Sequence, residues 1–207
     1  MESVSLTDKS VTDFLAAVRS PEPTPGGGST AALAGAMGAS LFAMMAGLPK
    51  SRATTAEDIA RLAAAGARCT ALADELKALI DRDSEAYDQV MAAYRLPKGT
   101  DDEKAARALR IDAALKAAIE TPLDVMRACA SAIAESEVVQ TFGNANASSD
   151  VRVGVELLRA GLRGARLNVE INLDALKDRA YADRAAAEAA RLTSNESGGG
   201  GAPTGPS

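Results

Sequence analysis

A single carboxylate interrupts an otherwise apolar helical stripe in the middle of the chain. Between residues 56 and 94 apolar side chains recur at helical spacing, and the position that should continue the stripe between Ile80 and Tyr87 is Asp83. A carboxylate in such a seam is costly unless it is paired. Asp83 therefore has one of two roles. It either fixes the register of two packed helices by bonding to a nearby Arg or Lys, or it is a functional group with a shifted pKa. Asp81 lies one step off the stripe and is predicted to be a solvated charge. The whole stripe consists of Cys69, Leu72, Leu76, Ile80, Tyr87, Val90 or Met91, and Tyr94.

Three consecutive glycines open a long uncharged segment. The run Gly26, Gly27, Gly28 and Ser29 lacks the Gly-Lys-Ser/Thr ending of a phosphate-binding loop, and no strand precedes it. Bare N–H groups at a helix N-terminus still attract an anion or a carbonyl oxygen, and glycine lets a ligand come close. The loop is therefore either part of a ligand site or a tight turn that leads into a crowded core helix.

Amide side chains occur in two further places. Asn144 and Asn146 lie in a loop that precedes a helix starting near Asp150, where Ser148, Ser149 or Asp150 could instead serve as an ordinary N-cap. Asn168 and Asn172 stand four residues apart in "LNVEINL", which alternates like a strand but is flanked by helical sequence. We predict a helix there, so both amides share one face and can either bind a ligand or bridge two helices.

The composition excludes several classes of chemistry. The chain of 207 residues has no histidine, which rules out Ser-His-Asp and Cys-His nucleophile systems and His-ligated zinc. The formal net charge of −5 argues against a nucleic-acid partner. Cys69 and Cys129 lie in apolar patterns without metal-ligand spacing, so we expect reduced core thiols and no metal site. The first ten residues lack the layout of a signal peptide, which predicts a cytoplasmic protein.

Helices account for nearly the whole chain. A short amphipathic helix at 11–18 is followed by a Pro/Gly loop, by a Gly/Ala-rich helix at about 29–47 and by a very long helix at 56–94. Thr100 and Glu103 form a capping box that starts the next helix. Thr121-Pro122 is interpreted as an N-cap with proline at the first helical position, which restarts or kinks that helix. The pattern predicts an all-α, elongated helical bundle.

The eighteen uncharged residues from Ala31 to Leu48 barely reach the length of a membrane span. They are rich in Ala and Gly, and their large residues recur at helical spacing, which favours a central buried helix over a membrane segment. Residues 1–194 are predicted to be one domain, and residues 195–207, "NESGGGGAPTGPS", a flexible tail. The long third helix spans about 55 Å, more than the width of a compact domain of this size, so part of it should lie against a second protomer.

Four segments in this order resemble the cyclodeaminase/cyclohydrolase family: "PTPGGGSTAALAGAMGASLFAMM", "DRDSEAYDQVMAAYRLPKGTDDEKAAR", "GNANASSDVRVG" and "ARLNVEINL". The resemblance covers roughly residues 10 to 190. It implies an all-helical homodimer that binds a tetrahydrofolate derivative near the subunit contact, with no cofactor. Where many members carry a Lys/Tyr-rich stretch after the buried helix, this chain has "LPKSRATTAEDIA", with Lys50 and Arg52 as its basic groups.

The resemblance implies a reaction at the one-carbon unit of a tetrahydrofolate, and the free-standing size of the chain favours hydrolysis of 5,10-methenyltetrahydrofolate to 10-formyltetrahydrofolate. With histidine absent, Asp83 is the expected general base, and Lys98 the expected acid or charge partner unless it is merely an exposed loop lysine. The glycine loop from Gly26 to Ser29 and the amide-bearing positions would bind the substrate; the latter are Asn144, Asn146, Asp150, Asn168 and Asn172. Two alternatives remain: a formimidoyltetrahydrofolate cyclodeaminase that releases ammonia, and a helical dimeric scaffold without activity.

Overall fold

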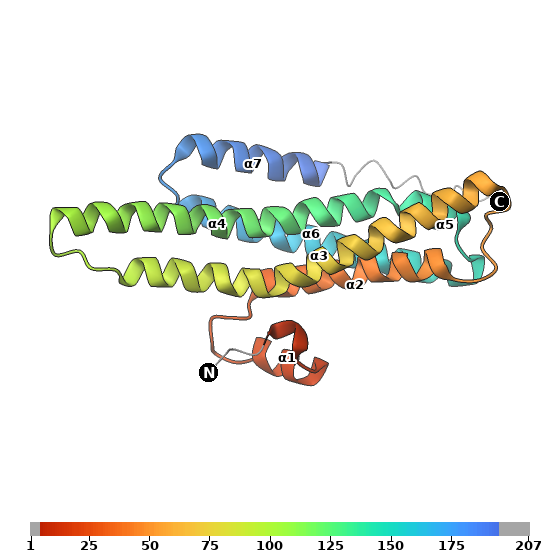
Figure 1. Cartoon of the computed structure of the whole chain (residues 1–207), viewed down its shortest axis with the longest axis horizontal. Helices are drawn as coiled ribbons and strands as arrows, with labels where there is room; N and C mark the ends of the chain where they lie inside the picture. The colour runs from red at the N-terminus through yellow and green to blue at the C-terminus, as the bar shows by residue number, and fades with distance from the viewer. Residues whose placement is uncertain (1–4, 195–207) are drawn as a thin grey trace, which may run out of the picture.

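The computed structural model describes residues 5–194, and its regular structure is helical throughout that range. The predicted tail at 195–207 lies outside the described residues. Four long helices run side by side along the length of the molecule, with α1 and α7 on opposite sides of them (Figure 1). The elements are η1 (Leu6–Asp8), α1 (Val11–Val18), α2 (Gly27–Gly47), α3 (Ala56–Arg95), α4 (Asp101–Ala134), α5 (Ser136–Phe142), η2 (Ala145–Ala147), α6 (Ser148–Ala175) and α7 (Arg179–Ser194). The all-α prediction and the long third helix are confirmed.

Helix α2 packs against α3 and α6 through very small side chains. A Cβ added to Gly38 would lie 2.7 Å from the backbone oxygen of Gly154, and one added to Gly154 would lie 2.7 Å from Cε1 of Phe42. The two helices therefore approach closely only because both positions are glycine. Phe42 and Met45 are the large buried residues of this inner face.

The outer face of α2 is apolar but uncovered in the single chain. Met37 and Met44 are 45% and 43% exposed, although the sequence pattern predicted a buried helix. By length and composition α2 could cross a membrane, but the core helix of a soluble protein passes the same test, and 44% of its apolar window is buried. The prediction is thus correct for the inner face and wrong for the large residues of the outer face.

The apolar stripe of α3 changes its course near Asp83. Leu76 and Ile80 are buried, whereas Tyr87 and Tyr94, which continue the predicted stripe, are 37% and 44% exposed in the single chain. In the second half of α3 the buried positions are Ala86 and Ala93. Alanines seven residues apart lie on one helix face and let the neighbouring helix approach closely, which leaves the tyrosine rings outside.

Asp81 is a structural anchor rather than the solvated charge that was predicted. Its carboxylate accepts hydrogen bonds from the hydroxyl of Ser5 (2.6 Å), from the backbone N–H of Leu6 (2.6 Å) and from the hydroxyl of Thr7 (3.3 Å). These donors belong to η1 and to its N-cap. Asp81 therefore holds the N-terminal segment against α3.

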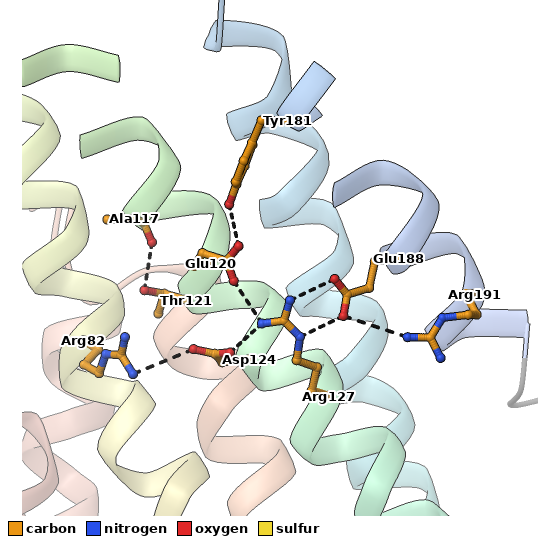
Figure 2. Close-up of polar contacts among 9 residues, drawn as sticks. All are labelled: Arg82, Ala117, Glu120, Thr121, Asp124, Arg127, Tyr181, Glu188 and Arg191. Carbon is orange, nitrogen blue, oxygen red and sulfur yellow. Dashed lines mark hydrogen bonds and ion pairs between the residues drawn. The ribbon is translucent and has the colours of Figure 1, made fainter. Parts of the chain in front are cut away.

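Helix α4 begins at the predicted capping box and continues through Pro122, so the interpretation of Thr121 as an N-cap that restarts the helix is wrong. The Thr121 hydroxyl donates to the Ala117 carbonyl, as mid-helix threonines do, and caps nothing (Figure 2). Pro122 has no N–H to give the carbonyl four residues earlier, that of Ala118. The side-chain amide of Asn172 on α6 donates to this carbonyl at 2.9 Å. A neighbouring helix thus satisfies the backbone group that proline leaves unpaired.

A network of charged side chains attaches α7 to the bundle. Arg127 on α4 donates from two nitrogens to the carboxylate of Glu188 on α7, both at 2.9 Å, and also contacts Glu120 and Asp124 on its own helix (Figure 2). The hydroxyl of Tyr181 on α7 donates to Glu120 at 2.5 Å. A two-pronged arginine–carboxylate pair is geometrically specific, which explains how a short alanine-rich helix keeps one position on the bundle.

Candidate functional site

Asp83 lies against the N-terminus of α2 and is held there by Ser29. The backbone N–H of Ser29 donates to Oδ2 of Asp83 at 2.8 Å. The Ser29 hydroxyl lies 3.0 Å from the same oxygen and 2.9 Å from the carbonyl oxygen of Ile80, and its one proton can serve either. No ion pair within residues 5–194 includes Asp83. The alternative in which Asp83 is paired with an Arg or Lys is therefore contradicted for these residues.

Gly28 is the reason that the carboxylate can reach this place. A Cβ built on Gly28 would lie 2.0 Å from Oδ1 of Asp83, far inside van der Waals contact. Any other residue at this position would displace the carboxylate from the helix end. The third glycine of the loop therefore makes room for a side chain of the same protein.

The environment of Asp83 raises the pKa of its carboxyl group. Burial in the helix seam is the main cause, and the two hydrogen bonds from Ser29 oppose it by stabilising the charged form. The positive end of the α2 dipole also favours the carboxylate. Oδ2 carries both hydrogen bonds, while Oδ1 accepts none from the residues that the structure describes. This is the arrangement of a positioned acid–base group with one oxygen free to take a proton.

Asn168 lies beside the same loop. A Cβ on Gly27 would lie 3.7 Å from Nδ2 of Asn168, and this amide donates to the Gly164 carbonyl at 2.9 Å. The loop and α6 enclose a hollow of about 420 Å³, whose lining includes Gly26, Gly27, Thr30, Ala160 and Gly164. The structure therefore brings the glycine loop, Asp83 and Asn168 together at one end of α2.

Two other residues near this end have structural contacts. Asn172 bonds the Ala118 carbonyl, which is the helix-bridging alternative that the sequence left open. Ser84 was not singled out from the sequence, yet its hydroxyl lies 3.3 Å from that of Ser29. Its position directly after Asp83 was the only signal that could have drawn attention to it.

The loop of Asn144 and Asn146 lies at the opposite end of α2. The amide of Asn144 donates to the Pro49 carbonyl at 2.8 Å, and its Oδ1 accepts from the backbone N–H of Asn146. Twenty residues of helix separate Gly27 from Gly47, about 30 Å. In one chain these amides and Asp150 are therefore remote from Asp83.

The start of α6 has no side-chain cap. Its N-cap position is Ala147, so the alternative in which Ser148, Ser149 or Asp150 caps the helix is wrong. Asn146 is exposed, and Asp150 is half-buried in the first turn of α6. Neither side chain is used as a cap, and both remain candidates for binding a ligand.

Lys98 lies in the loop between α3 and α4 and is exposed. Twelve residues of α3 separate Asp83 from Arg95, about 18 Å, so Lys98 is not beside Asp83 in the same chain. Its role as an acid stays a prediction. Within residues 5–194 no group of three or more His, Cys, Asp or Glu could hold a metal ion.

Comparison with known proteins assigns the chain to a family. Residues 10–191 match the sequence model of the family described as formiminotransferase-cyclodeaminase. The chain is 44% identical over 176 residues to the methenyltetrahydrofolate cyclohydrolase of Methylorubrum extorquens, covering 85% of each protein. It is 31% identical to the formimidoyltransferase-cyclodeaminase of Gallus gallus, of whose length the match covers 33%.

A solved structure has the same fold. The crystal structure of formiminotetrahydrofolate cyclodeaminase from Thermotoga maritima superposes with a TM-score of 0.82 at 26% identity, covering 94% of this chain and 93% of that one. The resemblance of the four sequence segments is thereby confirmed. The chain belongs to the formiminotransferase-cyclodeaminase family.

Proposed function

We propose that this protein is a methenyltetrahydrofolate cyclohydrolase, which hydrolyses 5,10-methenyltetrahydrofolate to 10-formyltetrahydrofolate. The observation that carries the proposal is the half-buried Asp83 carboxylate, held through one oxygen at the N-terminus of α2 with its pKa raised. The relative named for this activity supports it, since it is 44% identical over 85% of both chains.

The reaction needs little beyond one positioned carboxylate. The methenyl carbon is already cationic, so Asp83 takes a proton from water as the water oxygen bonds to that carbon. The resulting adduct then breaks its bond to N5, which takes up a proton, while the hydroxyl of the adduct loses its proton and becomes the carbonyl of the formyl group that remains on N10. One proton is released overall. The negative charge of Asp83 also stabilises the substrate cation.

In the proposed scheme no metal or cofactor takes part. The groups that bind the substrate during this step come from the chain itself. Gly27 lines the hollow and also lies against the side-chain amide of Asn168, which has the chemistry to bond the polar edge of a pterin. Small side chains at Ala160 and Gly164 leave room for a flat ring. We propose the same cytoplasmic setting for the protein that its sequence predicts.

The proposal includes a homodimer. The outer face of α2 carries Met37, Leu41 and Met44, and no charged residue occurs between Glu22 and Lys50. A helix that is apolar all round is normally buried all round. A second copy of the chain placed on this face would bury it.

Direct assay of both substrates tests the activity. Purified protein should accelerate the loss of methenyltetrahydrofolate absorbance without added metal or nucleotide, and should release no ammonia from 5-formimidoyltetrahydrofolate. The second reaction is the specific alternative, because the structural neighbour is a cyclodeaminase. Ammonia release that matches the formation of cyclised product would replace the cyclohydrolase by the cyclodeaminase. Absence of both activities, with no binding of a folate analogue in calorimetry, would favour a scaffold.

Sedimentation tests the dimer. The wild-type protein should sediment at about twice the monomer mass of 21.1 kDa. Met37→Glu places a charge in the middle of the proposed interface and should shift the protein towards monomer. Glu85→Gln, at an exposed position of α3, is the control and should remain dimeric. A wild-type monomer at micromolar concentrations would refute the proposed dimer.

A further inference from the structure

The hydroxyl group of Ser29 bonds to a neighbouring helix, unlike the other two hydroxyl groups of α2. Thr30 and Ser40 each donate to the carbonyl four residues earlier in α2, at 2.8 and 2.7 Å. Ser29 is fully buried, and its hydroxyl instead lies within hydrogen-bonding distance of three oxygen atoms of α3. These oxygens belong to Ile80, Asp83 and Ser84.

The backbone of Ser29 already holds Asp83 in place. The N-cap of α2 is Gly26, which has no side chain to accept from the first N–H groups of the helix. Oδ2 of Asp83 takes over this function for the N–H of Ser29 at 2.8 Å. This bond does not depend on the side chain at position 29. The hydroxyl of Ser29 is therefore not needed to attach the carboxylate to the helix end.

The hydroxyl has one proton and two strong acceptors. Its oxygen lies 2.9 Å from the carbonyl oxygen of Ile80 and 3.0 Å from Oδ2 of Asp83. A charged carboxylate is a stronger acceptor than a peptide carbonyl, whereas a protonated carboxyl group is not charged and loses this advantage. Ile80 lies inside α3, so its carbonyl also accepts a helical N–H and stays paired when the hydroxyl turns away.

We propose that Ser29 is a positioning residue whose hydroxyl changes its acceptor each time Asp83 gains or loses a proton. The hydroxyl donates to Oδ2 while the carboxylate is charged. It donates to the Ile80 carbonyl while Asp83 carries, on Oδ1, the proton taken from water. When Asp83 passes this proton to N5 of the substrate, the hydroxyl returns to Oδ2. The inference rests on the proposed cyclohydrolase activity and gives Ser29 a role other than contact with the substrate.

Rotation of a single O–H bond is enough to follow the charge of the base. Each orientation leaves the buried polar groups of this contact with partners, so neither protonation state of Asp83 requires a side chain to move. The hydroxyl of Ser84 lies 3.3 Å from that of Ser29 and can donate to its oxygen in both orientations. The three side chains thus form a small network that adapts to one proton.

Ser29, rather than a charged neighbour, opposes the effect of burial on Asp83. Burial raises the pKa of the Asp83 carboxyl group, and the hydroxyl and N–H of Ser29 lower it. Helix α2 has no charged residue, and α6 contributes the neutral amide of Asn168 at this end. On α3 the adjacent Arg82 contacts Asp124 of α4 at 3.8 Å. The hydroxyl bond is therefore the part of this balance that a substitution can remove.

The pH profile of Ser29→Ala tests the proposal. The variant keeps the N–H bond to Oδ2 and removes one bond to the charged form of Asp83, so the acid limb of kcat should move up by about one pH unit. Above this limb Asp83 is ionised again, and kcat should lie within about threefold of the wild type with KM unchanged. Thr70→Val removes an exposed hydroxyl that bonds within α3; as the control, it should leave the profile in place.

A double variant shows whether Ser29 acts through Asp83. On the acid limb Ser29→Ala alone should lower the rate by about tenfold, which is the result of a shift of one pH unit. In the Asp83→Asn background no carboxylate remains for the hydroxyl to follow, so the same substitution should lower the residual rate by less than about twofold. An independent role of Ser29 in binding or packing would multiply the two losses instead.

The proton on Asp83 can also be followed without substrate. In carboxyl-carbon NMR of aspartate-labelled protein, the signal that Asp83→Asn removes should titrate at a higher pH in Ser29→Ala than in the wild type. This measurement separates the inference from the proposed function. A shifted titration in a protein that hydrolyses no methenyltetrahydrofolate would remove the activity and retain the coupling between the two residues.

Two results would overturn the inference. One is an Asp83 titration and an acid limb that stay at the same pH without the hydroxyl. The other is a rise in KM of Ser29→Ala with an unmoved limb, which would make Ser29 a substrate-binding residue. If circular dichroism shows that Ser29→Ala loses helicity, Ser29→Cys replaces it in each measurement. Its thiol is only a weak donor, so the expected shift has the same direction.

Discussion

The two ends of α2 differ in how their polar groups are used. At the N-terminal end the Asp83 carboxylate is packed against Gly28 and bonded by Ser29, so its position and its pKa are set by neighbouring elements. At the C-terminal end both groups of the Asn144 amide are hydrogen-bonded to backbone groups, while the side chain of Asn146 remains exposed. A preorganised, half-buried carboxylate suits proton transfer, whereas exposed amides suit recognition. We therefore expect the chemistry at the first end and propose substrate recognition for the second.

The strongest test of this contrast is Asp83→Asn. The amide keeps the shape of the side chain and removes the base, so the turnover of methenyltetrahydrofolate should fall by about a hundredfold or more. Circular dichroism should show the same helicity as the wild type. The matched control is Asp88→Asn, an exposed carboxylate on the same helix, which should retain its activity. Full activity of Asp83→Asn would make Asp150 the next candidate base.

Two glycine substitutions distinguish the role of Gly28, which makes room for the Asp83 carboxylate, from that of Gly27, which lines the proposed ligand hollow. Gly28→Ala puts a methyl group 2.0 Å from Oδ1 of Asp83 and should lower turnover by about tenfold or more, because the base must move. Gly27→Ala meets only the Asn168 amide at 3.7 Å, so it should leave kcat nearly unchanged, and its effect on the ligand hollow should appear in KM. Steady-state kinetics of both variants measures the difference. Equal effects would mean that the position of Asp83 does not control the rate.

The pH profile should reflect the raised pKa of Asp83. The base must be ionised, so the acid limb of the rate should lie at a higher pH than an ordinary aspartate gives. The same shift means that the folded state binds its proton more tightly than the unfolded state. The contribution of Asp83 to stability is therefore largest below the unfolded pKa and is lost as pH rises through the folded pKa.

The predicted direction of this change in stability with pH can be measured independently of activity. Between the two pKa values the unfolding free energy of the wild type should decrease with rising pH more than that of Asp83→Asn, which has no proton to lose. Denaturant unfolding at several pH values records both proteins. Parallel curves would show that the Asp83 carboxyl group has the same pKa folded and unfolded.

The smallest expected effect on catalysis concerns Asn172. Asn172→Ala leaves the Ala118 carbonyl unpaired beside Pro122 and should lower the unfolding free energy by about 1–3 kcal/mol. Its kcat and KM should stay near those of the wild type, whereas Asn168→Ala should raise KM. Thermal unfolding and kinetics together distinguish the two asparagines. A large rise in KM for Asn172→Ala would return this residue to the ligand site.

Much of the fold and part of the site followed from local patterns. The periodicity of residues 56–94 predicted α3, the Thr100–Glu103 box predicted the start of α4, and Asp83 was identified as a carboxylate that interrupts the apolar stripe. These features depend on neighbours three or four residues away, which the sequence states directly. The same reasoning failed for Thr121 as an N-cap, because the carbonyl of Ala118 that Pro122 leaves unpaired accepts a bond from Asn172, which is far away along the chain.

The sequence by itself determined that the protein is helical, that it lacks histidine chemistry and that one carboxylate is out of place. Only the tertiary structure decided that Asp83 meets Ser29 and Gly28, that Asp81 anchors the N-terminal segment, and that the tyrosines of α3 lie outside the core. The physical reason is that helix formation depends on local spacing, whereas burial, pKa and hydrogen-bond partners depend on which helices pack together. Glycines at the contacts between α2 and α6 bring those helices close enough for distant residues to share one site.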